Sequence, residues 1–333
     1  MSQTLQPRPH TVHSRARPRV ALVTPALADA NNGNWQTARR WAAMLSQAYR
    51  VSLMSQWQAE PADLMIALHA RRSAVSIERW KARSGASPLV VVLTGTDLYR
   101  DIAHDAHARQ SLALADHLVV LNDLGAHRLP EAYRTKTSVV LQSCTARKPW
   151  PEPHRTLRVL MVGHLRDEKS PQTYFDAVLE LAHRRDLRFD HIGAALEPDL
   201  GQQAQALMRQ CPQYRWLGAR PHEEVRRRIQ RAGLLVHPSR MEGGAHVLIE
   251  AARSGTAVLA SGIDGNVGLL GEAYEGYFPV GNATALAHLI ASVQDVPGML
   301  SGLREQVLRQ APRFDPQREQ ASLLALVSAL LHR

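Results

Sequence analysis

The chain has 333 residues, of which 45% are hydrophobic and 21% charged, and its formal net charge is +10. This length allows two domains with separate cores, and no apolar run is long enough to cross a bilayer. The two cysteines, Cys144 and Cys211, form no motif, so neither a disulfide framework nor a zinc site is indicated. Residues 1–18 are basic but lack the apolar stretch of a signal peptide, and we expect a disordered tail on a cytoplasmic enzyme.

The positive charge comes almost entirely from arginine, because the chain contains only four lysines. The basic residues are dispersed along the sequence, and aromatic residues make up 5% of the chain, too few for a base-stacking platform. We therefore expect no nucleic-acid partner and no membrane insertion. An anionic small molecule suits this charge better.

The first half alternates apolar, β-branched runs with segments of helical period, which predicts parallel strands joined by crossover helices. This region, residues 19–145, is the first predicted domain. Strands are expected at 19–24, 51–55, 63–68, 89–93, 117–121 and 137–141, and helices at 34–48, 73–84, 100–115 and 124–133. A segment with three prolines follows, and it predicts a linker at 146–156.

The same alternation restarts at residue 157 and defines a second domain, 157–312. Strands are expected at 157–163, 188–192, 214–217, 234–237, 256–260 and 277–280, and helices at 171–185, 200–210, 222–232, 245–254 and 283–293. A last helix, 316–332 within the segment 313–333, is apolar on one face and is expected to pack back across the domains. The predicted fold is α/β: two facing, doubly wound Rossmann-like domains with a cleft between them, where ligands of such sheets bind.

A charged turn opens the second domain, in the stretch LMVGHLRDEKSP at 160–171. A strand runs into Gly163, and Arg166 and Lys169 then stand three residues apart just before a helix start. Two cations beside unpaired backbone N–H groups suit a diphosphate. The alternative interpretation is a solvated charged loop.

Two glutamates follow the strand at 234–237, in the stretch HPSRMEGGAHVLIEAARSGTAVLAS. Glu242 is predicted in the loop, and Glu250 two turns into the next helix. One carboxylate could then face a sugar while the other reaches ribose hydroxyls. The glycine pair between them lets the backbone approach a ligand closely.

At these residues the chain resembles the retaining, family-4-type glycosyltransferases with the GT-B fold, most strongly over 158–290. The resemblance implies that Arg166 and Lys169 bind the donor diphosphate, that Glu242 contacts the donor sugar, and that Glu250 holds the nucleotide ribose. Arg166, Lys169 and Glu242 are the predicted catalytic residues. The remaining predicted donor-binding residues are Gly163, Gly243, Gly244, His246, Gly265 and Asn266. The last two lie in a glycine-rich segment, 261–272, which lacks the family's usual glutamate.

The sequence contains no D-x-D motif, which is typical of metal-dependent donor sites in the other main glycosyltransferase fold. We therefore expect no metal and no cofactor, with a UDP-sugar as co-substrate. The two cations and a helix N-terminus would balance the diphosphate instead.

The first domain departs from the family pattern after its fourth strand, where many relatives carry a histidine. Here the stretch is VVVLTGTDLYRD, with Thr94, Gly95, Thr96 and Asp97 at the strand end. We place these four residues at the acceptor, although Asp97 could equally cap the next helix. The missing histidine argues against an alcohol acceptor that must lose a proton, and an anionic acceptor would need no base.

The loop DANNGNWQTARRW, 29–41, joins the first strand to the first helix and could hold such an anion. We predict acceptor contacts from Asn32, Gly33, Asn34 and Arg39; a polar loop with an asparagine cap is the alternative. Together with TGTDLYRD, this loop resembles the N-terminal half of the selenosugar synthases of selenoneine biosynthesis. The resemblance implies transfer of sugar from a UDP-sugar, expected to be UDP-N-acetylglucosamine, to the selenium of selenophosphate.

Three alternatives stay open on sequence grounds. The chain could be a conventional retaining glycosyltransferase acting on a hydroxyl, a non-catalytic nucleotide-sugar-binding protein, or a nucleotide-sugar epimerase of the same architecture. Partner enzymes of the same pathway are possible.

Overall fold

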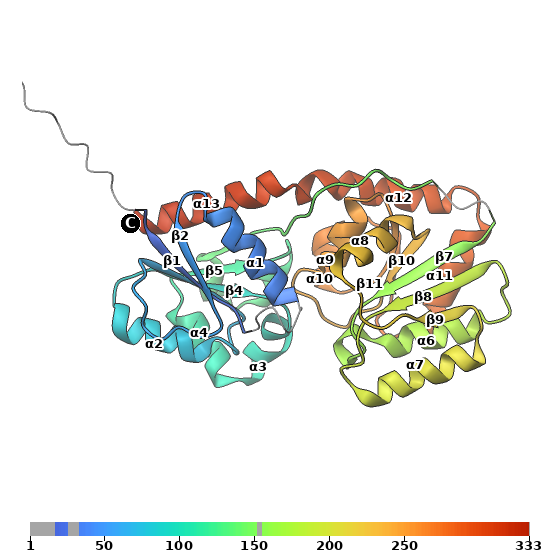
Figure 1. The fold of residues 1–333 in the computed structure, drawn as a ribbon, viewed down its shortest axis with the longest axis horizontal. Helices are drawn as coiled ribbons and strands as arrows, with labels where there is room; N and C mark the ends of the chain where they lie inside the picture. Colours follow the sequence, from blue (N-terminus) through green and yellow to red (C-terminus); the bar gives the residue numbers. More distant parts are fainter. Residues whose placement is uncertain (1–16, 26–32, 152–154, 333) are drawn as a thin grey trace, which may run out of the picture.

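The computed structural model describes residues 17–25, 33–151 and 155–332. It contains two α/β domains side by side, each built on a six-stranded parallel sheet (Figure 1). The predicted tail at 1–18 falls almost wholly outside the described residues. No helix in the described ranges is long and apolar enough to span a membrane.

The N-terminal sheet has the strand order β2-β1-β3-β4-β5-β6. Its strands are β1 (Arg19–Val23), β2 (Arg50–Met54), β3 (Leu64–Leu68), β4 (Leu89–Leu93), β5 (His117–Val120) and β6 (Thr137–Val139). Val20 and Leu22 face one core, whereas Ala21 and Val23 face another, because successive side chains of a strand point to opposite faces. Both faces are covered by helices, which explains why β3 and β4 consist of unbroken apolar residues.

One face of this sheet packs against α1 (Gly33–Leu45) and α13 (Pro316–Leu331), and the other against α2 (Ala74–Ser84) and α4 (Ala106–Leu114). The helix predicted at 100–115 is divided. A π-helical turn (Asp97–Asp101) and α3 (Ile102–His104) precede α4, which begins where the Asp105 carboxylate accepts a hydrogen bond from the Ala108 N–H. The segment predicted as a helix at 124–133 forms a 3-10 turn (Gly125–Arg128) and α5 (Glu131–Arg134), separated by Pro130.

The C-terminal sheet has the order β12-β11-β10-β7-β8-β9. Its strands are β7 (Leu157–Val162), β8 (Leu187–Ile192), β9 (Tyr214–Trp216), β10 (Leu234–His237), β11 (Ala257–Ser261) and β12 (Tyr277–Phe278). Its helices are α6 (Pro171–Glu180), α7 (Pro198–Gln210), α8 (His222–Arg231), α9 (His246–Ala252), α10 (Asp264–Leu270), α11 (Ala283–Asp295) and α12 (Met299–Gln310). The sequence did not predict α10 or α12. The pair of doubly wound α/β domains that it predicted is confirmed.

The last two helices connect the domains. Leu303 and Val307 of α12 lie in the core of the C-terminal domain, and Leu323 and Val327 of α13 lie in a core of the N-terminal domain. Figure 1 shows α13 running along the N-terminal domain beside α1.

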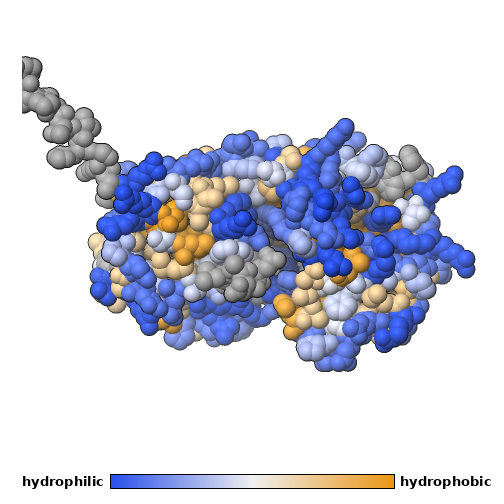
Figure 2. Space-filling view, viewed as in Figure 1, coloured by the Kyte–Doolittle hydropathy of each residue, from blue (hydrophilic) through white to orange (hydrophobic). Residues whose placement is uncertain are grey.

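Each sheet reverses its strand order at one point, and ligands of open α/β sheets bind at such switch points. In the N-terminal sheet the point lies between β1 and β3, and in the C-terminal sheet between β7 and β10. The loops that follow these four strands therefore form the candidate site. Figure 2 shows the surface hollowed where the two domains meet.

Candidate active site

The loop after β7 carries Arg166 and Lys169 and ends at the first turn of α6. Arg166 is about one-third exposed, and its buried Nε has no hydrogen-bond partner among the described residues. The nearest carboxylate, that of Glu168, lies 4.0 Å from this nitrogen. Lys169 is engaged, since its Nζ lies 2.5 Å from Oε1 of Glu242. Arg166 thus has only a distant carboxylate partner, whereas Lys169 is held by the predicted sugar-contacting carboxylate.

Glu242 follows β10 on the other side of the switch point. His237, the last residue of β10, places its Nε2 3.1 Å from Glu242 Oε1. Burial by itself would raise the pKa of Glu242, but the charge of Lys169 and the contact with His237 hold that pKa well below its usual range. Glu242 is therefore an anion at neutral pH, positioned between a lysine and a buried histidine.

Glu250 lies in α9, one turn from the start of the helix rather than the two turns that the sequence predicted, because α9 begins at His246. Its side chain is 3% exposed, and Oε1 lies 2.6 Å from His222 Nε2 and 3.3 Å from His246 Nδ1. Burial raises the pKa of Glu250, yet the two histidines outweigh burial and lower it to about 2. The carboxylate is ionised, and part of its hydrogen-bonding capacity is already used.

His222, His246 and Glu250 form the one group in the described ranges with the composition and spacing for a metal, with ligand atoms within 4.8 Å of one another. Two guanidinium groups adjoin it. Arg226 Nε lies 3.8 Å from Glu250 Oε1, and Arg40 Nη1 lies 3.3 Å from His246 Nε2. These positive charges oppose the binding of a cation.

The predicted donor glycines pack against protein groups. A Cβ on Gly243 would lie 2.4 Å from the Thr94 carbonyl, and one on Gly244 would lie 2.9 Å from Leu121 Cβ. Asn122 Nδ2 also donates to the Gly243 carbonyl across 2.7 Å. Gly243 and Gly244 therefore bring the loop of Glu242 against the N-terminal domain.

The other predicted donor residues lie within the C-terminal domain. A Cβ on Gly265 would meet the Glu242 carbonyl at 2.0 Å, so this glycine allows α10 to pack beneath that loop. Asn266 is buried and donates to the Ser261 carbonyl at 2.9 Å. Gly163 lies against the stem of Lys169.

On the predicted acceptor side, Asp97 is completely buried and forms its hydrogen bonds within the protein. Its carboxylate accepts hydrogen bonds at 2.9 Å from the backbone N–H groups of Ala70, Thr94 and Gly95. Asp97 therefore joins the loops after β3 and β4, and direct contact with an acceptor does not fit this burial. Thr94 and Thr96 stay partly exposed. Gly95 lies against Gly243, where an added Cβ would approach the Gly243 nitrogen to 3.0 Å.

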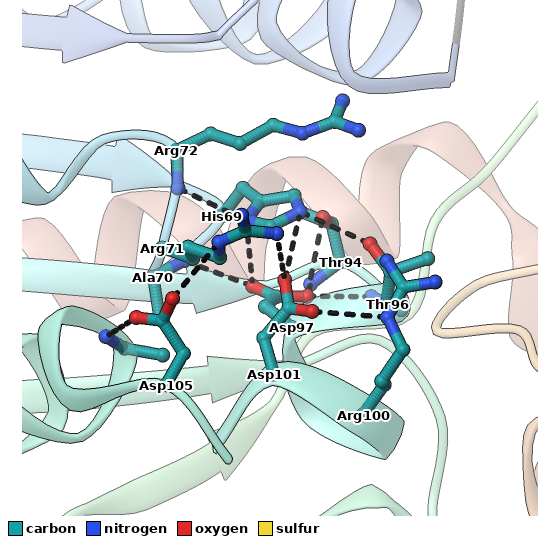
Figure 3. A network of polar contacts seen from close by, with 12 residues as sticks. His69, Ala70, Arg71, Arg72, Thr94, Thr96, Asp97, Arg100, Asp101 and Asp105 are labelled. Carbon is teal, nitrogen blue, oxygen red and sulfur yellow. Dashed lines mark hydrogen bonds and ion pairs between the residues drawn. The ribbon is translucent and has the colours of Figure 1, made fainter. Parts of the chain in front are cut away.

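The structure also brings His69, at the end of β3, into this cluster (Figure 3). His69 is buried and has φ +72°, a left-handed conformation that is uncommon for a residue other than glycine. Its Nε2 lies 3.1 Å from Thr96 Oγ1.

The predicted acceptor loop is described only in part. Asn32 lies outside the described residues, whereas Gly33 and Asn34 begin α1. Arg39 is exposed. The neighbouring Arg40 points elsewhere, because its guanidinium pairs with the buried Glu319 of α13 at 2.9 Å.

A comparison with protein-family models matches residues 142–311 to the model described as glycosyl transferases group 1. The chain belongs to this family. A search of curated proteins found no match.

Solved structures resemble this glycosyltransferase over nearly its whole length. Sucrose-phosphate synthase from Thermosynechococcus elongatus is 16% identical with a TM-score of 0.74, and the match covers 95% of this chain and 100% of that one. The Anabaena protein Alr3699/HepE, solved with UDP and glucose, is 17% identical with a TM-score of 0.72, covering 94% and 100%. The pneumococcal O-GlcNAc transferase GtfA, solved with UDP and GlcNAc, is 19% identical with a TM-score of 0.67, covering 90% and 61%. At these identities the likeness shows the fold.

Several residues in and around the candidate site were not predicted from the sequence: His69, His222 and the pair of Arg40 with Glu319. His69 directly follows a predicted buried strand, and a polar residue at the carboxyl end of a parallel strand could have been predicted to lie near the site. Nothing in the sequence signalled that His222 would meet Glu250. A cavity of about 320 Å³ near the start of β7, lined by Arg158, Arg227 and Arg231 among others, contains none of the candidate site residues.

Proposed function

We propose that this glycosyltransferase is a selenosugar synthase, which transfers the sugar of UDP-N-acetylglucosamine to the selenium of selenophosphate. The observation that carries the proposal is the contrast between the two sides of the cleft. The C-terminal side has the charges for a nucleotide diphosphate. The N-terminal side has hydroxyls and cations, and its Asp97 carboxylate and His69 ring are both held by hydrogen bonds within the protein.

The donor would lie along the loops after β7 and β10. Arg166, whose guanidinium has no hydrogen-bond partner at Nε, is available to the diphosphate. Lys169 can turn from Glu242 to the β-phosphate, which frees the Glu242 carboxylate for sugar hydroxyls. Glu250 would accept hydrogen bonds from the ribose. Charge on the leaving UDP grows in the transition state, so the two cations would contribute to the rate and not merely to binding.

The acceptor side supports a nucleophile that is already an anion. Asp97 has its oxygens in hydrogen bonds with three backbone N–H groups. His69 has Nδ1 beside the Arg72 N–H at 3.3 Å and Nε2 beside Thr96. Neither side chain is free to take a proton from an alcohol, and selenophosphate has none to lose at selenium.

The proposed reaction balances in two steps. Selenium forms a bond to C1 of the sugar while the bond between C1 and the β-phosphate oxygen breaks, and that oxygen leaves with the electron pair as UDP. Water then hydrolyses the selenium–phosphorus bond and releases inorganic phosphate and the 1-seleno-sugar.

The proposal needs no metal ion, because Arg166 and Lys169 supply the charge that a metal would bring to the diphosphate. Excess EDTA should leave the rate of UDP release unchanged. A rate restored only by added Mg²⁺ or Zn²⁺ would assign the group of His222, His246 and Glu250 to a metal instead.

The experiment that tests the function is incubation of the full chain with UDP-N-acetylglucosamine and either selenophosphate or phosphate, followed by mass spectrometry. UDP and a selenium-containing sugar should form only with selenophosphate. UDP-glucose in a parallel reaction tests the identity of the sugar. Transfer to a saccharide or lipid hydroxyl, with no selenosugar formed, would reject selenium as the nucleophile and leave a conventional glycosyltransferase.

A further inference from the structure

We infer that His69 is a positioning residue that orients the Thr96 hydroxyl toward an oxyanion of the acceptor. The inference deepens the proposed function and rests on it for the identity of the acceptor. The oxyanion site would lie at the switch point of the N-terminal sheet, and Arg72 would supply its charge.

The place of His69 in the fold is the first support. It follows β3 directly, and β3 and β1 flank the point where the strand order of the N-terminal sheet reverses. Ligands bind at the carboxyl ends of strands around such a point. Thr96 comes from the loop after the neighbouring β4, and adjacent Gly95 touches Gly243, the residue after Glu242. The pair is thus close to the loop that carries the donor-site glutamate.

The conformation of His69 is the second support. A φ of +72° costs free energy for a residue with a Cβ, and such strain persists where the surroundings hold it and is concentrated at functional sites. Here the side chain is held at both ring nitrogens. A residue needed only to fill space would not require this backbone.

The hydrogen bonds determine the direction of the Thr96 proton. The backbone N–H of Arg72 points to His69 Nδ1 at 3.3 Å, so Nδ1 accepts this hydrogen bond. The proton of the neutral ring is then on Nε2. Nε2–H then donates to Thr96 Oγ1 at 3.1 Å. With its oxygen accepting from His69, the Thr96 hydroxyl directs its own hydrogen to another acceptor, and an oxyanion in the cleft can fill that role.

The charges around the pair allow an anion. Asp101 lies 4.0 Å from His69 Nε2, but its charge is matched by Arg100 at 3.1 Å and Arg71 at 3.8 Å. Asp97 is held by backbone N–H groups. Figure 3 shows the Arg72 side chain extending away from the carboxylates. Arg72 is exposed and available to a ligand.

The test uses inorganic phosphate as the probe, titrated into UDP-saturated protein by calorimetry. His69→Asn keeps the left-handed backbone, which asparagine tolerates, and keeps an oxygen for the Arg72 N–H, but it removes the donor to Thr96. Thr96→Val removes the hydroxyl at constant shape. Each should weaken phosphate roughly tenfold or more, as expected for a hydrogen bond to a charged group. UDP affinity and melting temperature should stay near wild type.

Two further variants separate positioning from structure. His69→Gln, which can return an N–H near the position of Nε2, should restore part of the phosphate affinity. The double variant His69→Asn/Thr96→Val should bind phosphate no more weakly than Thr96→Val alone, because His69 acts through that hydroxyl. Thr284→Val is the control. Thr284 is exposed in the C-terminal domain, where its hydroxyl donates to Glu180, and its replacement should leave the affinity for phosphate unchanged.

Unchanged phosphate affinity in His69→Asn, or losses that add in the double variant, would overturn the inference. So would wild-type protein that fails to bind phosphate. These outcomes are independent of selenium chemistry. If the wild type makes no selenosugar but the variants weaken phosphate as described, the proposed function fails and the oxyanion site remains.

Discussion

Arg166 and Lys169 differ in one respect that decides how each can be tested. Lys169 is paired with Glu242, so replacing Lys169 removes a cation and also leaves the Glu242 carboxylate without its ion-pair partner. Arg166 has no carboxylate closer than 4.0 Å, so replacing it should remove the proposed contact with the donor and few contacts within the protein. Arg166 is the cleaner probe of the diphosphate assignment.

Arg166→Ala should lower turnover by about 10²–10³-fold, the usual loss when one preorganised donor to developing charge is removed. The melting temperature should hardly change, because no strong contact within the protein is lost. Arg209→Ala, at an exposed arginine of α7, is the matched control and should keep full turnover. Steady-state UDP release measures both. Wild-type turnover in Arg166→Ala would remove this residue from the donor site.

Glu250 should make the stability of the protein depend on pH in the acidic range. Its pKa falls from 4.5 to about 2 on folding, so the folded state favours the ionised carboxylate. The stabilisation is therefore complete above about pH 4.5 and is lost as the pH falls toward 2. In Glu250→Gln the free energy of unfolding should fall less steeply over this window. Chemical denaturation at several pH values measures the slope.

The control for this measurement is Glu272→Gln, at an exposed glutamate, which should keep the wild-type slope. Glu250→Gln should also weaken the binding of UDP in calorimetry, because the proposed ribose contact would serve the ground state and the transition state alike. Identical acid slopes in Glu250→Gln and wild type would show that the histidines do not stabilise this carboxylate.

At the scale of elements, the sequence predicted best where a segment is long and periodic. All twelve described strands were expected within a residue or two, and short β-branched runs such as LVVVL, bounded by turn residues, are typical of buried parallel strands. The helix α10 was missed since its seven residues, DGNVGLL, contain two glycines and show no period. Its glycines serve close packing against Glu242 and Asn122, which only the folded structure reveals.

The place of the candidate residues in the fold was predictable to the same extent. Loops that follow strands pointed to Arg166, Lys169 and Glu242, because the carboxyl ends of parallel strands share one edge. The sequence could not show which polar side chains form hydrogen bonds within the protein and are therefore not available to a ligand. Asp97 belongs to three backbone N–H groups, and that pairing depends on the relative position of two loops 27 residues apart.

The start of α1 offers a test of the predicted acceptor loop. A side chain added at Gly33 would meet no described atom within 4 Å, and the same holds for Gly302 within α12. Replacing a helical glycine by valine should change stability only slightly at either position. Gly33→Val should nevertheless raise the KM for the acceptor, because its side chain would block a close approach of the anion to the backbone. Gly302→Val should keep the wild-type KM.

Kinetics at varied selenophosphate, with melting temperatures of both variants, separate the two views of this loop. A lower melting temperature in Gly33→Val with an unaltered acceptor KM would leave the loop with a purely structural role.

At the scale of the whole molecule, the two domains meet through polar contacts that converge on the site. Arg100 of the N-terminal domain bonds Glu168 of the C-terminal domain at 3.0 Å, and Arg128 pairs with Asp264. Glu319 of α13 is the most buried of these groups. It accepts hydrogen bonds from Arg40, from Trp41 Nε1 at 2.7 Å and from Ser143 Oγ at 2.5 Å.

These contacts extend from α13 to Glu250, in the proposed donor site. Arg40 lies between Glu319 and His246, and His246 lies beside Glu250. A change at Glu319 therefore has two expected consequences, one for the stability of the N-terminal domain and one for the nucleotide.

Glu319→Gln should lower the free energy of unfolding by about 1–3 kcal/mol, because the amide has one accepting oxygen where the carboxylate has two, and a buried donor is left unpaired. The Arg40 guanidinium, released from its carboxylate, should move toward the ionised Glu250. The KM for the UDP-sugar should then rise while the KM for the acceptor stays constant. Glu305→Gln, at an exposed glutamate of α12, is the control and should change stability by less than about 0.5 kcal/mol. Urea denaturation and initial rates at varied UDP-sugar measure both effects; a loss of stability without any change in donor KM would show that α13 holds the N-terminal domain together but does not act on the nucleotide.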